Sequence, residues 1–183
     1  MRELSLNVLD IAQNSISANA SLIEIEIVGD TKKNELLIGI YDNGKGMTPE
    51  QVRNVQDPFF TTRTTRKVGL GIPLFKLAAE STGGSFEIRS EVGVGTTVTA
   101  VFGYSHIDRQ PLGNMAETIL GMVVSHENID FLYTHTRNGK AFSFDTAEVK
   151  KILGGVSLGE PEVYIWLSDY LTEGEEELDN LNI

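Results

Sequence analysis

The sequence predicts an α+β fold: a two-layer α/β sandwich in which helices cover one face of a mixed sheet, followed by a small α+β C-terminal unit. Three observations support this prediction. Apolar residues recur at helical spacing over residues 2–18. Two strand-like segments follow, and a second group of helices and strands begins after residue 103. With 183 residues, 40% of them apolar, the chain is long enough to build a core.

The first domain is predicted over residues 1–103. The stripe of residues 2–18 indicates one helix, on which Asp10 and Asn14 lie one turn apart. The segments 22–28 and 36–41 are expected to pair as strands. The rest of the domain is predicted as a short helix at 49–56, a threonine-rich loop, a helix at 71–81, and strands at 85–90 and 96–102.

The second half of the chain is predicted as a linker at 104–112, a small α+β unit at 113–172 and an acidic, frayed tail at 173–183. Asn138-Gly139 between two strand-like segments predicts a tight hairpin. Helices are expected at 115–125, at 147–153 and from Pro161 to Leu171.

The net charge of −11 is unevenly distributed. Residues 1–103 hold 10 Lys/Arg against 12 Asp/Glu, whereas residues 104–183 hold 5 against 14. An acidic second half repels phosphate backbones, so no nucleic-acid partner is expected, and its surface favours a protein partner instead. No apolar run approaches the roughly 20 residues of a membrane span, and no cysteine is present. These features predict a cytoplasmic protein with no membrane association.

A carboxylate and three glycine-rich segments suggest a nucleotide pocket. Asp42 follows an apolar strand, where it can accept a hydrogen bond from the exocyclic amine of adenine but not from the carbonyl of guanine. Gly44 and Gly46 allow the backbone to turn closely around a base. Thr96 is expected to bond Asp42 or a bridging water. The alternative is an ordinary Asp-Asn-Gly turn.

The segment before residue 71 carries phosphate-binding features. Arg63, Arg66 and Lys67 lie among threonines, and Gly69-Leu70-Gly71 precedes a helix whose first amides can hold phosphate oxygens. This arrangement predicts a mobile lid with Lys67 close to phosphate, and Phe59 and Phe60 as its packing anchors. A solvated basic loop is the alternative.

The segments occur in a recognisable order. They are Asn14, Asp42-Asn43-Gly44-Lys45-Gly46-Met47, Pro58-Phe59-Phe60-Thr61-Thr62, Val68-Gly69-Leu70-Gly71 and Gly93-Val94-Gly95-Thr96. Over roughly residues 2–102, they resemble the N, G1, F and G2 boxes of the GHKL ATPases, which unite gyrases, heat-shock chaperones, histidine kinases and mismatch-repair ATPases. The resemblance implies the Bergerat ATP-binding fold, ATP and Mg²⁺ as cofactors, and a histidine-kinase-like ATP-binding domain.

The resemblance also assigns roles to residues. Asn14 is the expected Mg²⁺ ligand, and Asp10 occupies the place of the residue that activates water, although a surface carboxylate is an equal alternative. The positions expected to bind the nucleotide are Asn14, Asp42, Gly44, Gly46, Met47, Thr62, Lys67, Val68, Gly69, Leu70, Gly71 and Thr96.

The chain begins inside the first of these boxes, without the phosphoacceptor hairpin that precedes the ATP domain of a histidine kinase. Ser125-His126-Glu127 resembles the start of a phosphoacceptor box but follows the ATP domain, so phosphotransfer to His126 is not expected. His106 and His135 are isolated, and no metal cluster is expected beyond magnesium.

Three functions are compatible with these residues. The first is an ATP-binding regulatory protein or kinase that acts on a partner protein in trans, docking through the acidic C-terminal unit. The second is a slow ATPase whose lid closure changes its conformation. The third is a nucleotide sensor without turnover. The oligomeric state is left open.

Overall fold

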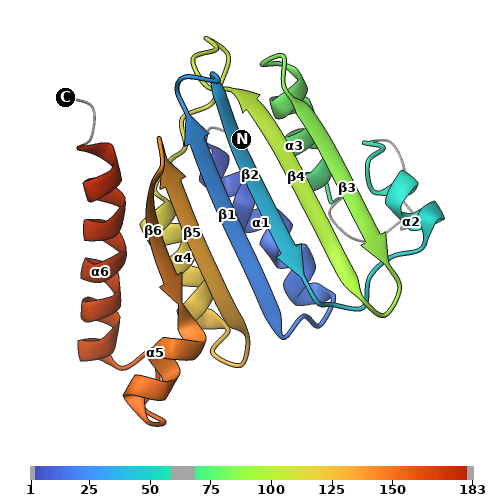
Figure 1. Cartoon of the computed structure of the whole chain (residues 1–183). Coiled ribbons are helices and arrows are strands. Elements are labelled where there is room, and N and C mark those ends of the chain that lie inside the picture. The colour runs from blue at the N-terminus through green and yellow to red at the C-terminus, as the bar shows by residue number, and fades with distance from the viewer. Residues whose placement is uncertain (1–2, 59–68, 181–183) are drawn as a thin grey trace.

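The computed structural model describes residues 3–58 and 69–180 (Figure 1). The elements of the N-terminal part are α1 (Leu4–Ser17), β1 (Leu22–Asp30), β2 (Glu35–Asp42), α2 (Pro49–Asn54), α3 (Gly71–Glu80), β3 (Ser85–Glu91) and β4 (Gly95–Gly103). Those of the C-terminal part are α4 (Met115–Ser125), β5 (Asp130–Arg137), β6 (Lys140–Asp145), α5 (Thr146–Leu153) and α6 (Pro161–Asp179).

The strands form one six-stranded mixed sheet in the order β3-β4-β2-β1-β5-β6. The pairing of β1 with β5 is parallel, and the other four pairings are antiparallel. Helices α1, α3 and α4 lie on the same side of the sheet (Figure 1). The sheet therefore has one helix-covered face, which confirms the predicted two-layer α+β fold.

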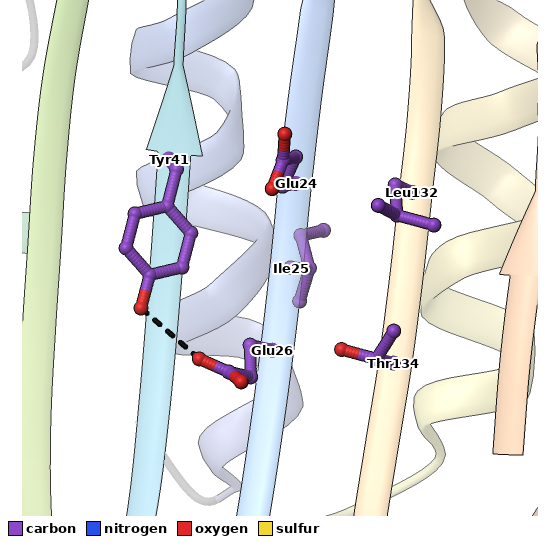
Figure 2. Close-up of a pocket in the computed structure, with 6 residues that line it drawn as sticks. All are labelled: Glu24, Ile25, Glu26, Tyr41, Leu132 and Thr134. Atoms are coloured by element: carbon purple, nitrogen blue, oxygen red, sulfur yellow. Dashed lines mark hydrogen bonds between the residues drawn. The ribbon is translucent and has the colours of Figure 1, made fainter. Parts of the chain in front are cut away.

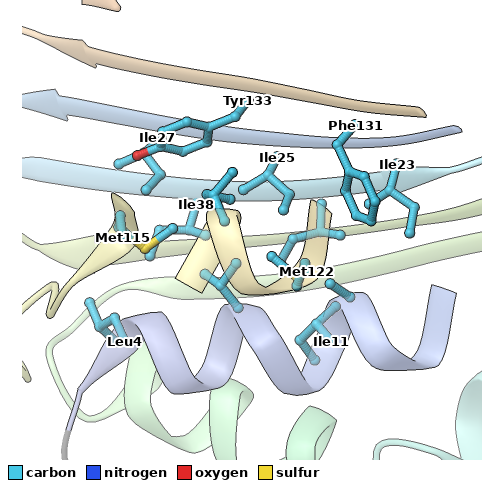
Figure 3. Close-up of a cluster of buried hydrophobic side chains, with 14 of the residues drawn as sticks. Leu4, Ile11, Ile23, Ile25, Ile27, Ile38, Met115, Met122, Phe131 and Tyr133 are labelled. Atoms are coloured by element: carbon cyan, nitrogen blue, oxygen red, sulfur yellow. The ribbon is translucent and has the colours of Figure 1, made fainter. Parts of the chain in front are cut away.

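The core lies between this sheet face and the helices (Figure 3). In β1 every second side chain is buried, and Ile23, Ile25 and Ile27 are at most 1% exposed. They face Leu4 and Ile11 of α1 and the buried methionines of α4 (Figure 3). Apolar residues at every second position of the strand and at every third or fourth position of the helices therefore pack together in one layer.

The C-terminal strands extend the sheet of the first domain. β1 pairs with β2 on one side and with β5 on the other, in register from Leu22 with Asp130 to Gly29 with Arg137. A domain boundary near residue 104 stays a prediction. The expected linker has a structural role, because the carbonyls of Pro111 and Leu112 accept hydrogen bonds from the N–H groups of Leu4 and Ser5 at the start of α1.

The predicted hairpin is confirmed, since β5 and β6 are antiparallel around Asn138-Gly139, both with positive φ. The acidic segment after residue 173 was expected to fray, but residues 173–179 continue α6.

Contacts with β5 and β6 explain this extension of α6. Glu175 accepts hydrogen bonds from the hydroxyl of Tyr133 at 2.6 Å and contacts His135 Nδ1 at 2.9 Å. Burial, with Glu175 beside it, raises the pKa of Tyr133 well above its usual value, so Tyr133 stays a neutral donor. These polar contacts and the burial of Leu178 hold the last turns of the helix in place.

Candidate functional site

The candidate site lies where β2 ends beside the C-terminal half of α1. Asp42, the last residue of β2, accepts a hydrogen bond from Ser15 Oγ at 2.5 Å and another from the Gly44 N–H at 2.9 Å. The two bonds reach different carboxylate oxygens, and each oxygen can accept a second bond. Asp42 is therefore fixed in position while it keeps acceptor capacity for an amine of a ligand.

The loop after Asp42 is held closely against its neighbours. A Cβ on Gly44 would lie 2.9 Å from the Ala18 carbonyl oxygen, and one on Gly46, whose φ is +68°, would overlap the carbonyl of Glu91. Both positions therefore require glycine. The Lys45 N–H also donates to the Ala18 carbonyl at 2.9 Å, so the loop is tied to the end of α1.

Thr96 lies directly opposite Asp42 in the pairing of β2 with β4. Its hydroxyl, expected to bond Asp42 or a water, lies 2.8 Å from Ser90 Oγ. Ser90 Oγ also accepts from the Met47 N–H at 2.8 Å. Ser90 thus joins the predicted base-side residues Met47 and Thr96, whereas Ser15 ties Asp42 to α1.

Asp10 and Asn14 project from α1 one turn apart, and both side chains are exposed. Within residues 3–58 and 69–180, neither side chain has a hydrogen-bond partner. Asp10 faces the start of α3, because a Cβ on Gly71 would lie 3.0 Å from Asp10 Cβ. Although the Asp10 side chain is exposed, neighbouring protein atoms remove part of its hydration, and this desolvation raises its pKa above the usual value.

The helix α3 begins at Gly71, next to Asp10. The N–H groups of Gly71 and Ile72 lie in its first turn and have no acceptor within the helix, and Pro73 has no N–H. Such a helix start attracts anions through its free amides and its dipole. Leu70 precedes it with an exposed side chain, and a Cβ on Gly69 would meet no neighbour within 4 Å.

Several predicted site residues lie outside the described part of the chain. These are Thr62, Lys67 and Val68, together with the lid residues Phe59, Phe60, Arg63 and Arg66. Their roles stay predictions. Of the others, Asp10 and Asn14 lie on α1, and Asp42, Gly44, Gly46 and Met47 lie at the end of β2 and in the loop after it. Thr96 lies at the start of β4, Gly69 and Leu70 directly precede α3, and Gly71 begins it.

Two residues of the site were not predicted from the sequence, and a third acts beside it. Ser15 orients Asp42, and Ser90 joins Met47 to Thr96. Asn43 accepts hydrogen bonds from the Ser21 and Leu22 N–H groups at 2.9 Å, which fixes the start of β1 against the loop. Ser15 could have been identified from the sequence, because it is a polar residue on the buried face of an apolar helix. Ser90 had none, since a serine in an edge strand is common.

The histidines have local structural contacts. His126 Nδ1 lies 3.2 Å from the Met122 carbonyl oxygen, and the neighbouring Glu127 accepts from Ser157 Oγ at 2.6 Å and from the Leu158 N–H at 3.1 Å. Among the described residues there is no group of three or more histidine or acidic side chains placed to hold a metal. Over the same residues, no helix has the length and apolar character needed to cross a lipid bilayer.

A shallow depression of about 210 Å³ lies on the sheet face opposite α1, α3 and α4, with Glu24, Glu26 and Tyr41 among its lining residues (Figure 2). The Tyr41 hydroxyl donates to Glu26 Oε2 at 3.1 Å across Gly39. Because strand neighbours point to opposite faces, this depression is separated from the site at Asp42 by the sheet itself.

The chain is similar to several known proteins. Residues 1–105 match the family described as histidine kinase-, DNA gyrase B- and HSP90-like ATPases. The sensor protein SrrB of Staphylococcus aureus is 40% identical over 40% of this chain. That region is 14% of SrrB, so the chain spans a small part of the relatives it matches in sequence.

Two solved structures share the fold. The Aquifex aeolicus MutL ATPase domain complexed with ADP has a TM-score of 0.53 at 20% identity, over 84% of this chain and 70% of that one. The N-terminal domain of a DNA repair protein has a TM-score of 0.56 at 18% identity, over 78% of this chain and 52% of that one.

Proposed function

Because the chain belongs to the family of histidine kinase-, DNA gyrase B- and HSP90-like ATPases, we propose that it is an Mg-ATP-binding regulatory protein that acts on a partner protein in trans. In this proposal the ATP-binding domain acts as a kinase or as an ATP-dependent switch, and the acidic C-terminal half contacts the partner. The matched region of residues 1–105 contains every residue to which the proposal assigns a role in nucleotide binding.

The observation that carries the proposal is the hydrogen bonding of the Asp42 carboxylate. Two donors orient its carboxylate, Ser15 Oγ and the Gly44 N–H, and the remaining lone pairs suit an exocyclic amine. A guanine carbonyl in the same place would leave two acceptors facing each other, which a preformed polar site rejects strongly. This pairing supports adenine as the base and ATP as the nucleotide.

The chemistry of Asn14 suits magnesium. Its amide offers a neutral, hard oxygen on an exposed helix surface, and no described residue occupies that amide with a hydrogen bond. When bound, Mg²⁺ offsets the negative charge of the phosphates. The N–H groups of Gly71 and Ile72, which have no acceptor within α3, suit phosphate oxygens.

Asp10 gives specific support to a slow ATPase as the second candidate. A base needs a free carboxylate with a pKa near the working pH, and Asp10 has no hydrogen-bond partner among the described residues. Desolvation by neighbouring protein atoms raises its pKa, which makes the carboxylate a stronger base. A sensor without turnover remains the third candidate, in which ATP shifts a conformational population.

The test is phosphate release from Mg-ATP by the wild-type protein and by an Asp10→Asn variant, with ATP binding measured separately by calorimetry. Release that Asp10→Asn lowers by about 100-fold or more, with binding retained, supports the ATPase. Binding without release, followed by transfer of the γ-phosphate label to a co-purified protein, supports the kinase. Absence of ATP binding by the wild-type protein would overturn the whole proposal.

The pH dependence of release gives a further check. If Asp10 is the base, its deprotonated form is the active one, so release falls as the pH drops through the pKa of Asp10. Because that pKa is raised, the decline begins at a higher pH than for an ordinary aspartate. A flat profile across the acidic range, at unchanged ATP binding, would argue against Asp10.

A further inference from the structure

We propose that the outward face of α6 carrying Ile165, Trp166 and Tyr170 docks a basic amphipathic helix of a partner protein. This inference deepens the proposed function and rests on it for the existence of a partner, because a regulator that acts in trans needs a docking surface. We call these three residues the outer stripe of α6.

The outer stripe is more exposed than apolar side chains usually are. Ile165 is 60% exposed, Trp166 46% and Tyr170 42%. Other exposed apolar residues lie close by in the sequence, on α5, after it and on α6: Ile152, Val156 and Tyr164. The spatial contact that defines the surface is that between Trp166 and Tyr170, whose rings stack; exposed apolar side chains in mutual contact indicate an interaction surface, whereas scattered ones need no explanation.

The core does not require this stripe. The opposite side of α6 already supplies the buried contacts, through Leu167 and Leu171 at 0% exposure and Leu178 at 1%. The helix thus has an inner apolar stripe that attaches it to the fold and an outer one that stays 42–60% exposed, although Tyr170 also packs against Phe142 and Phe144 of β6. Figure 1 shows α6 at the end of the sheet next to β6, on the outside of the molecule.

The aromatic rings of the outer stripe are held in position before any partner arrives. The Trp166 and Tyr170 rings stack with centroids 6.0 Å apart at 29°. Tyr170 in turn packs on Phe142, 5.4 Å away, and its hydroxyl donates to the Ser143 carbonyl at 3.3 Å. Rigid, partly exposed Trp and Tyr side chains lose little conformational entropy on binding and dominate many interfaces.

Charge identifies the class of partner. Residues 160–180 contain eight Asp or Glu and no Lys or Arg. Glu162, Asp169 and Glu173 lie three or four residues from Trp166 or Tyr170, so they share this face of the helix, and Asp169 lies between Ile165 and Trp166 around the helix axis. A second copy of α6, an anionic membrane and a nucleic acid would all meet repulsion here. A helix with apolar residues on one side and Lys or Arg beside them complements both features.

Trp166 is the only tryptophan of the chain and therefore reports on this surface directly. The probe is a synthetic helical peptide of about 18 residues, five turns, with Leu and Phe on one face and Lys and Arg on the others. We expect a blue shift of Trp166 emission on titration and weaker binding as the salt concentration rises. A control peptide with the same apolar face and Glu in place of Lys and Arg should not bind.

Matched variants locate the binding surface. The double variant Asp169→Lys/Glu173→Lys should lower the affinity for the basic peptide by at least about tenfold, since it removes two attractive charges and adds two repulsive ones. Glu35→Lys/Glu80→Lys changes the net charge equally at exposed positions of the first domain and should leave the affinity within about twofold. Ile165→Ser, which keeps the tryptophan, should also weaken binding. Far-UV circular dichroism checks that each variant is folded.

Other outcomes would overturn the inference. They are equal binding of the acidic peptide, equal weakening by both charge-reversed pairs, an emission shift with anionic vesicles, or self-association of the full chain that Ile165→Ser abolishes. ATP binding is measured on the same samples. If ATP binds and the basic peptide does not, docking alone fails, whereas loss of ATP binding with peptide binding intact contradicts the proposed function alone.

Discussion

At the scale of single residues, the site depends on small polar groups that orient a larger one. Ser15 is 3% exposed and lies on the buried side of α1, where a hydroxyl without a partner would be costly. Its partner is Asp42 on a different element, at 2.5 Å. The same bond therefore satisfies a buried hydroxyl and fixes the direction of the carboxylate.

The hydrogen bond between Ser15 and Asp42 predicts that substitutions of the two residues lower ATP affinity to different extents. Asp42→Ala removes the proposed acceptor for adenine and should lower ATP affinity by at least about tenfold, with a smaller preference over GTP. Ser15→Ala keeps the carboxylate and removes one orienting bond, so a loss of about two- to tenfold is expected. Calorimetric titration with ATP and GTP measures both.

Glu80→Ala, an exposed carboxylate at the end of α3, is the control and should leave the affinity unchanged. If Ser15→Ala weakened ATP binding more than Asp42→Ala, the proposed order of contacts would be wrong.

At the scale of elements, two helical glycines occupy opposite environments. Gly174 lies within α6, and a Cβ there would overlap the ring of Phe142 on β6. Gly121 lies within α4, and a Cβ there would meet nothing within 4 Å. The intrinsic preference of a helix for alanine is the same at both sites, so the difference between them isolates packing.

We expect Gly121→Ala to raise the free energy of unfolding by about 0.5–1 kcal/mol, because alanine is the better helix former. Gly174→Ala should lower it by about 1–3 kcal/mol, because the added methyl pushes α6 away from Phe142. Urea unfolding followed by far-UV circular dichroism measures both. An increase in stability for Gly174→Ala would mean that Phe142 moves aside at little cost.

At the scale of the whole molecule, the parallel pairing of β1 with β5 joins the two halves of the chain. The core under this pairing contains Ile25 of β1 and Tyr133 of β5, which are directly opposite in the register. Both side chains are at most 1% exposed. Separation of the halves would expose this layer to water, so the sheet is expected to unfold as one cooperative unit.

The prediction is that Trp166 fluorescence, which reports on α6, and far-UV circular dichroism, which reports on the whole chain, give coincident urea transitions. ATP at 100 times its dissociation constant should raise the free energy of unfolding measured by both signals by about 2.7 kcal/mol, although the proposed ATP site lies in the N-terminal half. A fluorescence transition that comes first and does not respond to ATP would show that residues 104–183 unfold independently.

The sequence by itself determined the elements whose signals are local, together with the family. The apolar stripe of α1, the Asn138-Gly139 hairpin and the glycine-rich segments depend on spacings within a few residues, which the backbone geometry imposes directly. The order of those segments was sufficient to identify the family and therefore the fold. The roles of Asp42 and Asn14 in binding ATP and Mg²⁺ stay predictions, which follow from the residue type and from the family resemblance.

Only the tertiary structure decided which distant segments meet. Three features depend on contacts between residues far apart in sequence. They are the pairing of β1 with β5, the serines that contact Asp42 and Thr96, and the continuation of α6 past residue 173. Leu22 and Asp130 carry no local mark that they pair, because they are 108 residues apart in the sequence and the elements from β2 to α4 lie between the two strands. Likewise, the acidic end of α6 is helical because Glu175 reaches Tyr133 and His135 on β5.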